Sequence, residues 1–387
     1  MSKVKDMDLA EEGKKLLDWA VSNMPVLASI RERFKKEKPL SGIRVGVALH
    51  LEKKTGILLE TLVAGGAEVS AASCNPLTTD DRIAAALADD INVFAWAGQN
   101  EDDYYDCLEL VINSKPQITI DDRCDLIHLL HTKFSDQLNE VIGGCEETTT
   151  GIVRLNAMKN EGELKFPVMA VNNEHSKYLF DNRYGTGQSV IEGILNATNM
   201  LIAGKTAVVV GYGWCGRGIA NRLKGLGAKV IVVESANENP GASSGYRRAL
   251  EASYDGCWVM SLDEASPLGD IFITATGNKH VISGAHLGKM KDGAILANSG
   301  HFNHEIDLGS LDALSDSKET ILTNVEKYYL KNGKHIVLLA EGRLVNLAQP
   351  TGQGHPIEIM DGSFAIQALC VEHLAKNGSN MAAGVYD

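Results

Sequence analysis

The sequence has little proline, no excess of positive charge and no closely paired cysteines, and each shortage narrows the class of protein. Only 9 of its 387 residues are proline, 38 are glycine and 44% are hydrophobic. This is the composition of an ordinary folded protein with room for two domains. Lys and Arg total 37 against 50 for Asp and Glu, giving a formal charge of −13. Nucleic acid and anionic membranes are therefore not expected partners, because both are bound through cationic side chains.

Neither the cysteines nor the apolar runs point to secretion or a membrane. The seven cysteines are odd in number, scattered and without a C-x-x-C pair. This pattern favours a reduced, cytoplasmic setting and neither a disulfide framework nor a zinc site. The N-terminal segment lacks the apolar core of a signal peptide, and no segment approaches the roughly 18 uninterrupted apolar residues of a membrane span. We therefore expect a cytoplasmic protein with no metal ion.

Strands and helices alternate through most of the chain. Residues 8–36 have the apolar spacing of helices, with Pro25 as the expected break. Strands are predicted at 43–49, 68–73, 92–97, 117–122, 206–213, 229–234, 270–276 and 294–299. The alternation predicts an α/β protein with two doubly wound, Rossmann-like domains, each on a parallel sheet.

The segment "VVVGYGWCGRGIANRL" carries the motif G-x-G-x-x-G at Gly211, Gly213 and Gly216. The motif follows a predicted strand and opens a predicted helix, and Glu234 ends the next strand about 20 residues on, as the dinucleotide fingerprint requires. Glycines let backbone N–H groups approach a pyrophosphate at the helix N-terminus. Because the Glu234 charge would repel a 2′-phosphate, the pattern favours NAD over NADP.

A charged cluster, "HLEKKT" at residues 50–55, stands where the first predicted strand ends. Charge at such a corner is ordinarily the solvated start of a helix. Sites on open parallel sheets, however, lie beyond the carboxyl ends of the strands, where His50, Asp121, Asp122 and Glu234 all stand. The residues alone leave both interpretations of the cluster open.

Five further segments resemble a single enzyme family, S-adenosylhomocysteine hydrolase. They are "GGCEETTTG" (143–151), "HSKYLFDNRYGTGQS" (175–189), "GKTAVVVGYGWCGRGIA" (204–220), "ANSGHFNHEID" (297–307) and "LLAEGRLVNLA" (338–348). The resemblance implies a substrate-binding domain at residues 1–183, completed by 348–387, and an NAD-binding domain at 184–347. It also implies bound NAD, a thioether nucleoside as substrate and a homo-oligomer, either a tetramer or a dimer.

The family's reaction explains the residue types. NAD oxidises the ribose 3′ carbon, the 4′ proton is removed, the thiol leaves the 5′ carbon, water adds, and the sugar is reduced again. The catalytic residues implied by the resemblance are His50, Asp122, Glu147, Lys177, Asp181 and His301. Lys177 and Asp181 would assist the oxidation, and Glu147 would hold the ribose hydroxyls. Asp122 would take part in proton transfer at the 4′ carbon.

The remaining matches concern the 5′ end, the homocysteine end, the cofactor and the base. His50 would lie near the 5′ position, and His301 with Phe302 would gate the homocysteine end. The NAD contacts implied are Thr148, Thr149, Thr150, Asn182, Gly211, Gly213, Gly216, Glu234, Thr276, Asn298 and Asn346. The residues expected near the base are Glu52, Lys54, Thr55, Asp80 and His355.

The chain departs from the family at the residues that face the base. Where the family usually reads His-x-Thr-x-Glu-Thr, this sequence reads "HLEKKT", which resembles a methanogen-like branch associated with S-inosylhomocysteine. Lys54 can donate a hydrogen bond to a 6-oxo group but cannot accept one from a 6-amino group. The insertion at 235–247 brings Arg247 near the NAD adenine edge, and the C-terminal arm of most relatives, which reaches the neighbouring subunit's NAD, does not follow "GVYD".

Three functions remain open on the sequence alone. The first is NAD-dependent hydrolysis of S-inosyl- or S-adenosyl-L-homocysteine. The second applies the same oxidation and elimination to the 5′ dehydration of a nucleoside. The third is a non-catalytic, NAD-binding paralogue, which the altered pocket and missing arm would suit but the retained catalytic residues disfavour.

Overall fold

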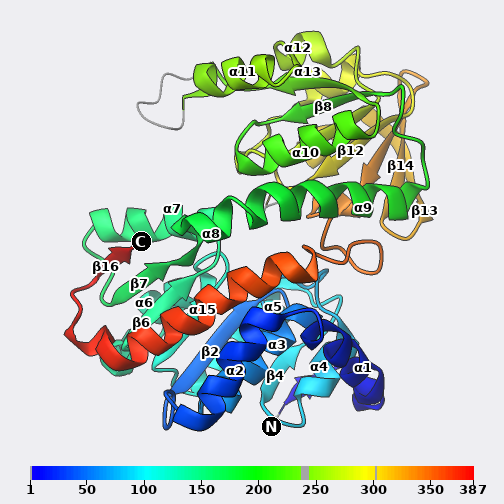
Figure 1. The fold of residues 1–387 in the computed structure, drawn as a ribbon. Helices are drawn as coiled ribbons and strands as arrows, with labels where there is room; N and C mark the ends of the chain where they lie inside the picture. The colour runs from blue at the N-terminus through cyan, green and yellow to red at the C-terminus, as the bar shows by residue number, and fades with distance from the viewer. Residues whose placement is uncertain (1, 237–243, 301–302) are drawn as a thin grey trace. The chain divides into compact units, whose positions relative to one another are not determined.

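The computed structural model describes residues 2–236, 244–300 and 303–387 of the chain. Two compact units divide it: Met1–Tyr178 with Ile357–Asp387 form unit 1, and Leu179–Pro356 form unit 2. The chain returns to unit 1 through the long helix α15 (Ile357–Asn377), drawn in orange-red in Figure 1. These divisions lie within nine residues of the expected ones at 183/184 and 347/348.

Unit 1 is built on an eight-stranded sheet whose described strands all pair in parallel. Its order is β1 (Lys3–Val4), β4 (Asn92–Ala95), β3 (Glu68–Ser73), β2 (Arg44–Leu49), β5 (Ile118–Asp121), β6 (Gly143–Glu146), β7 (Pro167–Ala170) and β16 (Gly384–Tyr386). The chain adds β3 and β4 on one side of β2, and β5, β6 and β7 on the other. The strand order therefore reverses between β2 and β5, which is the switch point where open α/β sheets bind ligands.

Helices cover both faces of this sheet because its strands carry apolar side chains on both sides. One face packs on α1 (Ala10–Val21), α2 (Pro25–Glu37), α3 (Lys53–Ala64), α4 (Asp81–Leu87) and α15 (Figure 1). The other face packs on α5 (Glu101–Asn113), α6 (Asp125–Thr132) and α7 (Thr149–Asn160). Along β2, Val45 and Val47 belong to the first core and Ala48 to the second. Pro25 begins α2 and separates it from α1, which confirms the predicted break.

Unit 2 repeats the architecture with an antiparallel extension. Its order is β10 (Trp258–Val259), β9 (Lys229–Val233), β8 (Thr206–Val210), β11 (Ile271–Thr274), β12 (Ala294–Asn298), β15 (His335–Leu339), β14 (Val325–Leu330) and β13 (Ser315–Leu322). The order reverses between β8 and β11, so this sheet also has a switch point. The predicted fold class, two doubly wound parallel sheets, is confirmed. The antiparallel pairs β14–β15 and β13–β14 were not predicted.

Alternating residues of β8 face two different cores in unit 2. Ala207 and Val209 pack with α9 (Thr186–Thr198) and α10 (Trp214–Gly225). Val208 and Val210 pack with α12 (Leu262–Ala265), α13 (Gly284–Lys289) and α14 (Leu308–Leu314). Across the described parts of both units, none of the helices combines the length and apolarity that crossing a membrane requires.

Candidate functional site

His50 and Asp122 lie on the two sides of the switch point in unit 1. His50 directly follows β2, and Asp122 directly follows β5, the neighbouring strand. The distance from His50 Nε2 to Asp122 Oδ2 is 3.2 Å, and the two side chains are 14% and 3% exposed. An imidazole against a buried carboxylate can hold and pass a proton. The fold thus brings together two residues that the sequence analysis named separately.

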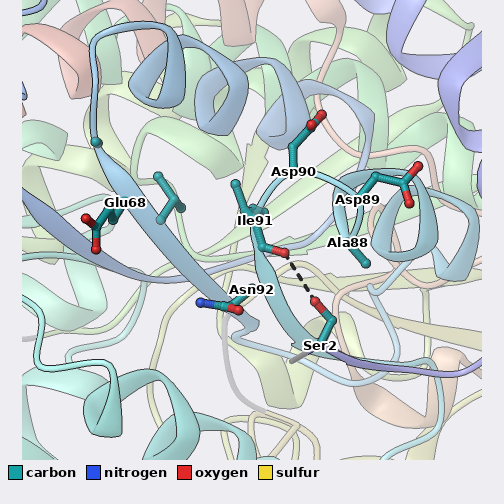
Figure 2. A pocket seen from close by; sticks show the side chains of 9 residues that line it. Ser2, Glu68, Ala88, Asp89, Asp90, Ile91 and Asn92 are labelled. Carbon is teal, nitrogen blue, oxygen red and sulfur yellow. Dashed lines mark hydrogen bonds between the residues drawn. The ribbon is translucent and has the colours of Figure 1, made fainter.

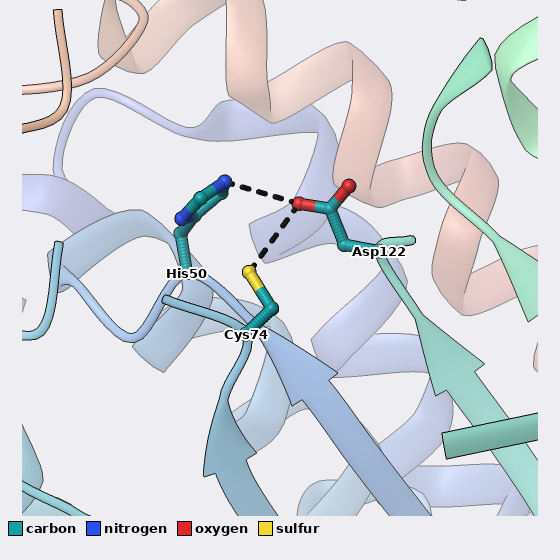
Figure 3. Close-up of side chains that lie close together, drawn as sticks. All are labelled: His50, Cys74 and Asp122. Atoms are coloured by element: carbon teal, nitrogen blue, oxygen red, sulfur yellow. Dashed lines mark hydrogen bonds and ion pairs between the residues drawn. The ribbon is translucent and has the colours of Figure 1, made fainter. Parts of the chain in front are cut away.

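Cys74 completes a group of three with this pair (Figure 3). It follows β3, and its Sγ lies 3.6 Å from the same oxygen, Asp122 Oδ2. Burial and the adjacent Asp122 carboxylate raise the pKa of the Cys74 thiol well above its usual range. Sequence reasoning missed Cys74, because no neighbouring residue in the chain marks an isolated cysteine as part of a site.

Two carboxylate doublets end adjacent strands, and the first member of each holds backbone. Asp121 and Glu146 are paired in register across β5 and β6. Asp121 accepts hydrogen bonds from the N–H groups of Asp122 and Ile127. Glu146 accepts from the N–H groups of Arg123, Cys124 and Thr148, and from Thr148 Oγ1. These first carboxylates therefore fix the loops that carry Asp122 and Glu147.

Burial also changes the acidity of the inner carboxyl groups. Burial and the nearby Asp125 charge raise the pKa of Asp121 to about 7. Burial and the charges of Asp121 and Asp122 raise the pKa of Glu146 well above its usual range. Gly151 leaves room for the Glu146 carboxyl, because a Cβ there would lie 2.0 Å from Glu146 Cδ.

Glu147 belongs to a buried polar group with Lys177. Lys177 Nζ lies 3.5 Å from Glu147 Oε1 and donates to Asn172 Oδ1 at 3.1 Å. Asn172 in turn donates from Nδ2 to Thr149 Oγ1 at 2.9 Å. The side chains of Lys177 and Glu147 are only 3% and 8% exposed. The lysine is therefore an interior cation held against a carboxylate, and not the surface residue that it could have been on sequence alone.

Helix α15 contributes two residues that sequence reasoning missed. Ser363 Oγ donates to Glu147 Oε1 at 2.8 Å, and Gln367 Nε2 donates to Glu147 Oε2 at 2.6 Å. Both are fully or almost fully buried. The only signal in the sequence was two polar residues, four apart, on a helix that is otherwise largely apolar. They orient Glu147 toward one geometry, since each of its oxygens has its own donor.

The charged cluster at residues 50–55 is not solvated. Lys54 is 2% exposed, and its Nζ lies 2.8 Å from Glu52 Oε2. Glu52 is the N-cap of α3 and accepts from the N–H groups of Lys54 and Thr55. Thr55 Oγ1 donates to the His50 carbonyl at 2.7 Å. The cluster is thus a buried ion pair at a helix start, tied directly to His50.

Asp80, predicted to lie near the base, is held by an arginine. It is the N-cap of α4, and its carboxylate accepts from Arg82 Nε at 2.9 Å and from Arg82 Nη2 at 2.8 Å. The backbone N–H of Asp80 donates to the Leu51 carbonyl. Asp80 therefore lies beside the segment that carries Glu52 and Lys54, while its charge is balanced by Arg82.

The glycine loop of unit 2 has the shape that a pyrophosphate requires. Gly211 adopts φ 98°, a conformation that side chains disfavour. A Cβ on Gly216 would lie 2.0 Å from the Gly211 carbonyl oxygen, so the helix can approach only with glycine there. A Cβ on Gly213 would meet no atom within 4 Å, which leaves open space over the start of α10. These residues fit NAD.

Glu234 binds the glycine loop as well as ending β9. Its Oε2 accepts from the Tyr212 N–H at 2.8 Å, and its Oε1 accepts from the Ser235 N–H at 3.1 Å. Arg248 Nη1 lies 3.8 Å from Glu234 Oε2. The predicted insertion lies mainly at 237–243, outside the described residues, and α11 (Gly245–Tyr254) follows it.

Glu305 is a further residue that the sequence analysis did not name. It is fully buried and accepts from Thr276 Oγ1 at 2.7 Å and from the N–H groups of Thr276 and Gly277. Burial raises the pKa of Glu305. Asn298 similarly joins three segments, since its Oδ1 accepts from Thr274 Oγ1 and its Nδ2 donates to the Gly342 carbonyl. Both residues shape the loops at the second switch point.

Two buried polar atoms at this edge have no hydrogen-bond partner among the residues that the structure describes. They are Asn346 Oδ1 and Ser299 Oγ. Asn346 Nδ2 donates to Ser189 Oγ at 3.1 Å, which fixes the orientation of the amide. Orphaned buried polar atoms mark a place for a polar ligand, and Asn346 was expected to contact NAD.

His355 contacts Asp181, a pairing that the sequence did not reveal. His355 Nδ1 is bonded to Asp181 Oδ1, and His355 Nε2 lies 3.2 Å from Thr186 Oγ1. A Cβ on Gly185 would lie 2.8 Å from the imidazole. The three side chains therefore form one group at the π-helical turn Asp181–Gly185 and the start of α9.

The remaining predicted residues are placed more simply. Thr148 is the N-cap of α7, which Thr149 and Thr150 begin, and Asn182 lies in the π-helical turn. His301 and Phe302 lie outside the described residues, so their expected role as a gate stays a prediction.

A hollow of about 440 Å³ opens at the opposite edge of the unit 1 sheet, where β3 and β4 begin (Figure 2). Its acidic members are Glu68, Asp89 and Asp90, and Ser2 Oγ donates to the Ile91 carbonyl beside it. It lies away from the switch point, and none of the predicted site residues lines it.

Two family models match the chain. Residues 1–142 match "S-adenosyl-L-homocysteine hydrolase", and residues 182–352 match "S-adenosyl-L-homocysteine hydrolase, NAD binding domain". Among curated proteins, the S-inosyl-L-homocysteine hydrolase of Methanopyrus kandleri is 55% identical over 99% of this chain and 88% of that protein. The same-named protein of Methanocaldococcus jannaschii is 55% identical over 100% and 91%.

An adenosylhomocysteinase is almost equally similar. The protein of that name from Sulfolobus acidocaldarius is 54% identical over 100% of this chain and 90% of its own length. Overall identity therefore does not separate the two substrate names. Among solved structures, a dipicolinate synthase from Bacillus halodurans superposes with a TM-score of 0.50 at 14% identity, covering 87% of this chain and 99% of that one. This last likeness concerns the fold alone.

Proposed function

The chain belongs to the S-adenosyl-L-homocysteine hydrolase family, and we propose that within it the protein prefers S-inosyl-L-homocysteine to the adenosyl compound. It is an NAD-dependent thioether hydrolase with a substrate domain and an NAD-binding domain. The observation that carries the proposed preference is the buried ion pair between Lys54 and Glu52.

The ion pair matches the hydrogen-bonding edge of hypoxanthine. That base presents a 6-oxo acceptor beside an N1–H donor, whereas adenine presents a 6-amino donor beside an N1 acceptor. Lys54 can only donate, and ionised Glu52 can only accept. With Nζ and Oε2 only 2.8 Å apart, the pair offers one donor beside one acceptor. This order complements hypoxanthine and opposes adenine.

The cost of the wrong base follows from the burial of this pair. Adenine would place its 6-amino donor against the Lys54 ammonium and its N1 acceptor against the Glu52 carboxylate. Each buried group left without a partner costs about 1–3 kcal/mol. One such loss corresponds to about a 10- to 100-fold preference, because 1.4 kcal/mol is about tenfold.

Two groups in this chain would serve the two proton-transfer steps. NAD, when bound, supplies the reversible oxidation of the ribose 3′ carbon. Lys177 accepts the 3′ hydroxyl proton, and Glu147, oriented by Ser363 and Gln367, holds the ribose hydroxyls. Asp181, fixed by His355, assists this step from unit 2.

Elimination of the thiol then uses the pair at the first switch point. Asp122 takes the 4′ proton, and His50 gives a proton to the sulfur as the bond from C5′ to sulfur breaks. A proton passing from Asp122 to His50 across 3.2 Å restores both groups. Water next adds its oxygen to C5′ and a proton to C4′, and reduction of the 3′ carbon completes a redox-neutral cycle.

Base preference can be measured directly on the NAD-loaded protein. We would compare kcat/KM for thiol release from S-inosyl- and S-adenosyl-L-homocysteine, in wild type and Lys54→Glu. Wild type should favour the inosyl substrate by at least about tenfold, since one buried donor-acceptor mismatch has that value. Lys54→Glu should reduce or reverse the preference. Lys53→Glu is the matched control, because Lys53 is adjacent in α3 and less buried, and it should preserve the preference.

The other outcomes discriminate among functions. An adenosyl preference unchanged by Lys54→Glu would contradict the proposed role of Lys54. A dehydrated nucleoside without thiol release would favour the 5′ dehydratase. No turnover of any thioether nucleoside despite stoichiometric NAD would favour the non-catalytic paralogue.

The family likeness also supports a homo-oligomer in the cytoplasm. All seven cysteines are free thiols in the structure, which suits a reducing compartment. Light scattering coupled to size exclusion should give the mass of a dimer or tetramer of the 41.7 kDa chain. A monomer mass at micromolar concentration would contradict the assembly.

A further inference from the structure

The group His50, Cys74 and Asp122 has a property that thioether hydrolysis does not require. Each side chain offers one metal-ligating atom, and these three atoms all lie within 4.8 Å of one another. They follow β2, β3 and β5, three adjacent strands, so the fold and not a short sequence spacing brings them together (Figure 3). The scattered cysteines had argued against a zinc site, because that argument depends on residues close in sequence.

The observed distances match the edges of a zinc tetrahedron. Zinc binds nitrogen and oxygen at about 2.0–2.2 Å and sulfur at about 2.3 Å, so tetrahedral ligands lie about 3.3 Å apart for N and O and about 3.6 Å apart for S and O. Here Nε2 and Oδ2 are 3.2 Å apart, and Sγ and Oδ2 are 3.6 Å apart. Only the distance between His50 Nε2 and Cys74 Sγ remains to be set by the metal.

A neighbouring residue orients the imidazole for ligation. Thr78 Oγ1 donates to the Asn75 carbonyl at 2.8 Å, so its oxygen accepts from His50 Nδ1 at 2.7 Å. In the neutral imidazole this leaves the lone pair on Nε2, directed at Asp122. Metal-binding histidines are commonly fixed in this way by a partner on the other ring nitrogen.

We propose that unit 1 binds one zinc-class divalent cation through His50 Nε2, Cys74 Sγ and an Asp122 carboxylate oxygen, and that this cation reversibly inhibits the enzyme. Three protein ligands leave a fourth position open for water. A nitrogen, sulfur and oxygen set selects Zn²⁺ or Co²⁺ over Mg²⁺, which requires oxygen ligands. Binding displaces the Cys74 thiol proton to solvent.

Inhibition follows from which atoms the cation occupies. The lone pairs of His50 and Asp122 would be held by the metal, so neither residue could move a proton in the elimination. The zinc site itself involves only unit 1 and does not depend on which base the enzyme prefers. Zinc binding and base preference can therefore fail independently.

Metal binding can be tested without an activity assay. NAD-loaded protein is treated with EDTA, dialysed against Zn²⁺ and analysed for bound metal, and Co²⁺ binding is followed by its visible absorption. Wild type should bind one equivalent, with a sulfur-to-cobalt charge-transfer band. Cys74→Ser should bind at least tenfold more weakly and lose that band. Cys145→Ser, which alters another buried thiol of the same sheet, should bind as wild type, and Mg²⁺ should not compete.

Inhibition is then followed through nucleoside formation, because the homocysteine product would itself bind zinc. Zn²⁺ should abolish nucleoside release by wild type, and EDTA should restore it. If Cys74→Ser does not fold, by circular dichroism, Asp122→Asn replaces it in the binding experiment. No stoichiometric zinc in wild type would overturn the proposal. Zinc binding unchanged in both variants would do the same.

Discussion

The two switch points of the molecule have the same topology and very different chemistry. In unit 1 the edge holds a buried imidazole, a buried ammonium group and paired carboxylates, each with defined partners. In unit 2 the equivalent edge holds a glycine turn, backbone N–H groups and open space beside Gly213. One sheet edge thus presents groups that can move protons, and the other presents a backbone surface that can receive a pyrophosphate.

The comparison teaches that the fold supplies the position and the side chains supply the function. Charged groups are tolerated in unit 1 because each is balanced or bonded, as Lys177 is by Glu147 and Asn172. In unit 2 the buried carboxylates Glu234 and Glu305 accept backbone N–H groups and so act on loop shape. Changes at one edge should therefore affect chemistry, and changes at the other should affect cofactor retention.

The largest expected effect is that of Asp122→Asn. The amide cannot accept the 4′ proton, so kcat for thiol release should fall by about 10²- to 10⁴-fold. Bound NAD should remain at the wild-type level because Asp122 belongs to unit 1. Thiol release and NAD content measured on one preparation check both statements. Loss of NAD together with activity would remove the distinction between the edges.

Gly213→Ala tests the other edge. Gly213 has φ −67°, which alanine adopts readily, and its Cβ would meet no protein atom within 4 Å. Stability without cofactor should be unchanged, while NAD affinity falls by about tenfold or more, because the methyl group occupies the pyrophosphate approach. Calorimetric titration with NAD measures the effect. In Gly216→Ala the new Cβ meets the Gly211 carbonyl, so stability itself should fall.

Glu146→Gln should act on loop shape in unit 1. Glutamine keeps only one carbonyl acceptor in place of the two oxygens that receive Arg123, Cys124 and Thr148. We expect a loss of about 1–3 kcal/mol in the free energy of unfolding, from one unsatisfied buried donor. Urea denaturation measures it. An unchanged midpoint would mean that the loops hold without this carboxyl group.

A pH dependence of stability is the smallest effect. The pKa of Asp121 is raised from 3.8 to about 7 in the folded protein. Between these values the folded state keeps a proton that the unfolded state has released, so the free energy of unfolding should fall as pH rises through this window. Burial of Glu146 contributes in the same direction. Asp121→Asn should flatten the slope, and Asp102→Asn, at an exposed position, should leave it unchanged.

The sequence predicted those features that local patterns encode. Strand and helix alternation gave both doubly wound sheets, and the spacing of Gly211, Gly213 and Gly216 gave the turn after β8. The strand ends of β2 and β5 placed His50 and Asp122 at one edge, although their contact needed the strand order.

The missed features depend on partners distant in the chain. Ser363 and Gln367 reach Glu147 from more than 200 residues away. His355 and Asp181, assigned to different roles, meet because the chain returns to the start of α9. Lys54 was expected to face the base, and its pairing with Glu52 depends on burial, which the sequence of a helix start does not determine.

The most direct test of this division of labour is a single turnover of NAD-loaded Asp122→Asn with S-inosyl-L-homocysteine. Absorbance of the reduced nicotinamide and released thiol are recorded together. Oxidation at the 3′ carbon does not need Asp122, so the account predicts that the nicotinamide becomes reduced while almost no thiol appears. Thiol release at the wild-type rate, or no reduction at all with NAD fully bound, would contradict it.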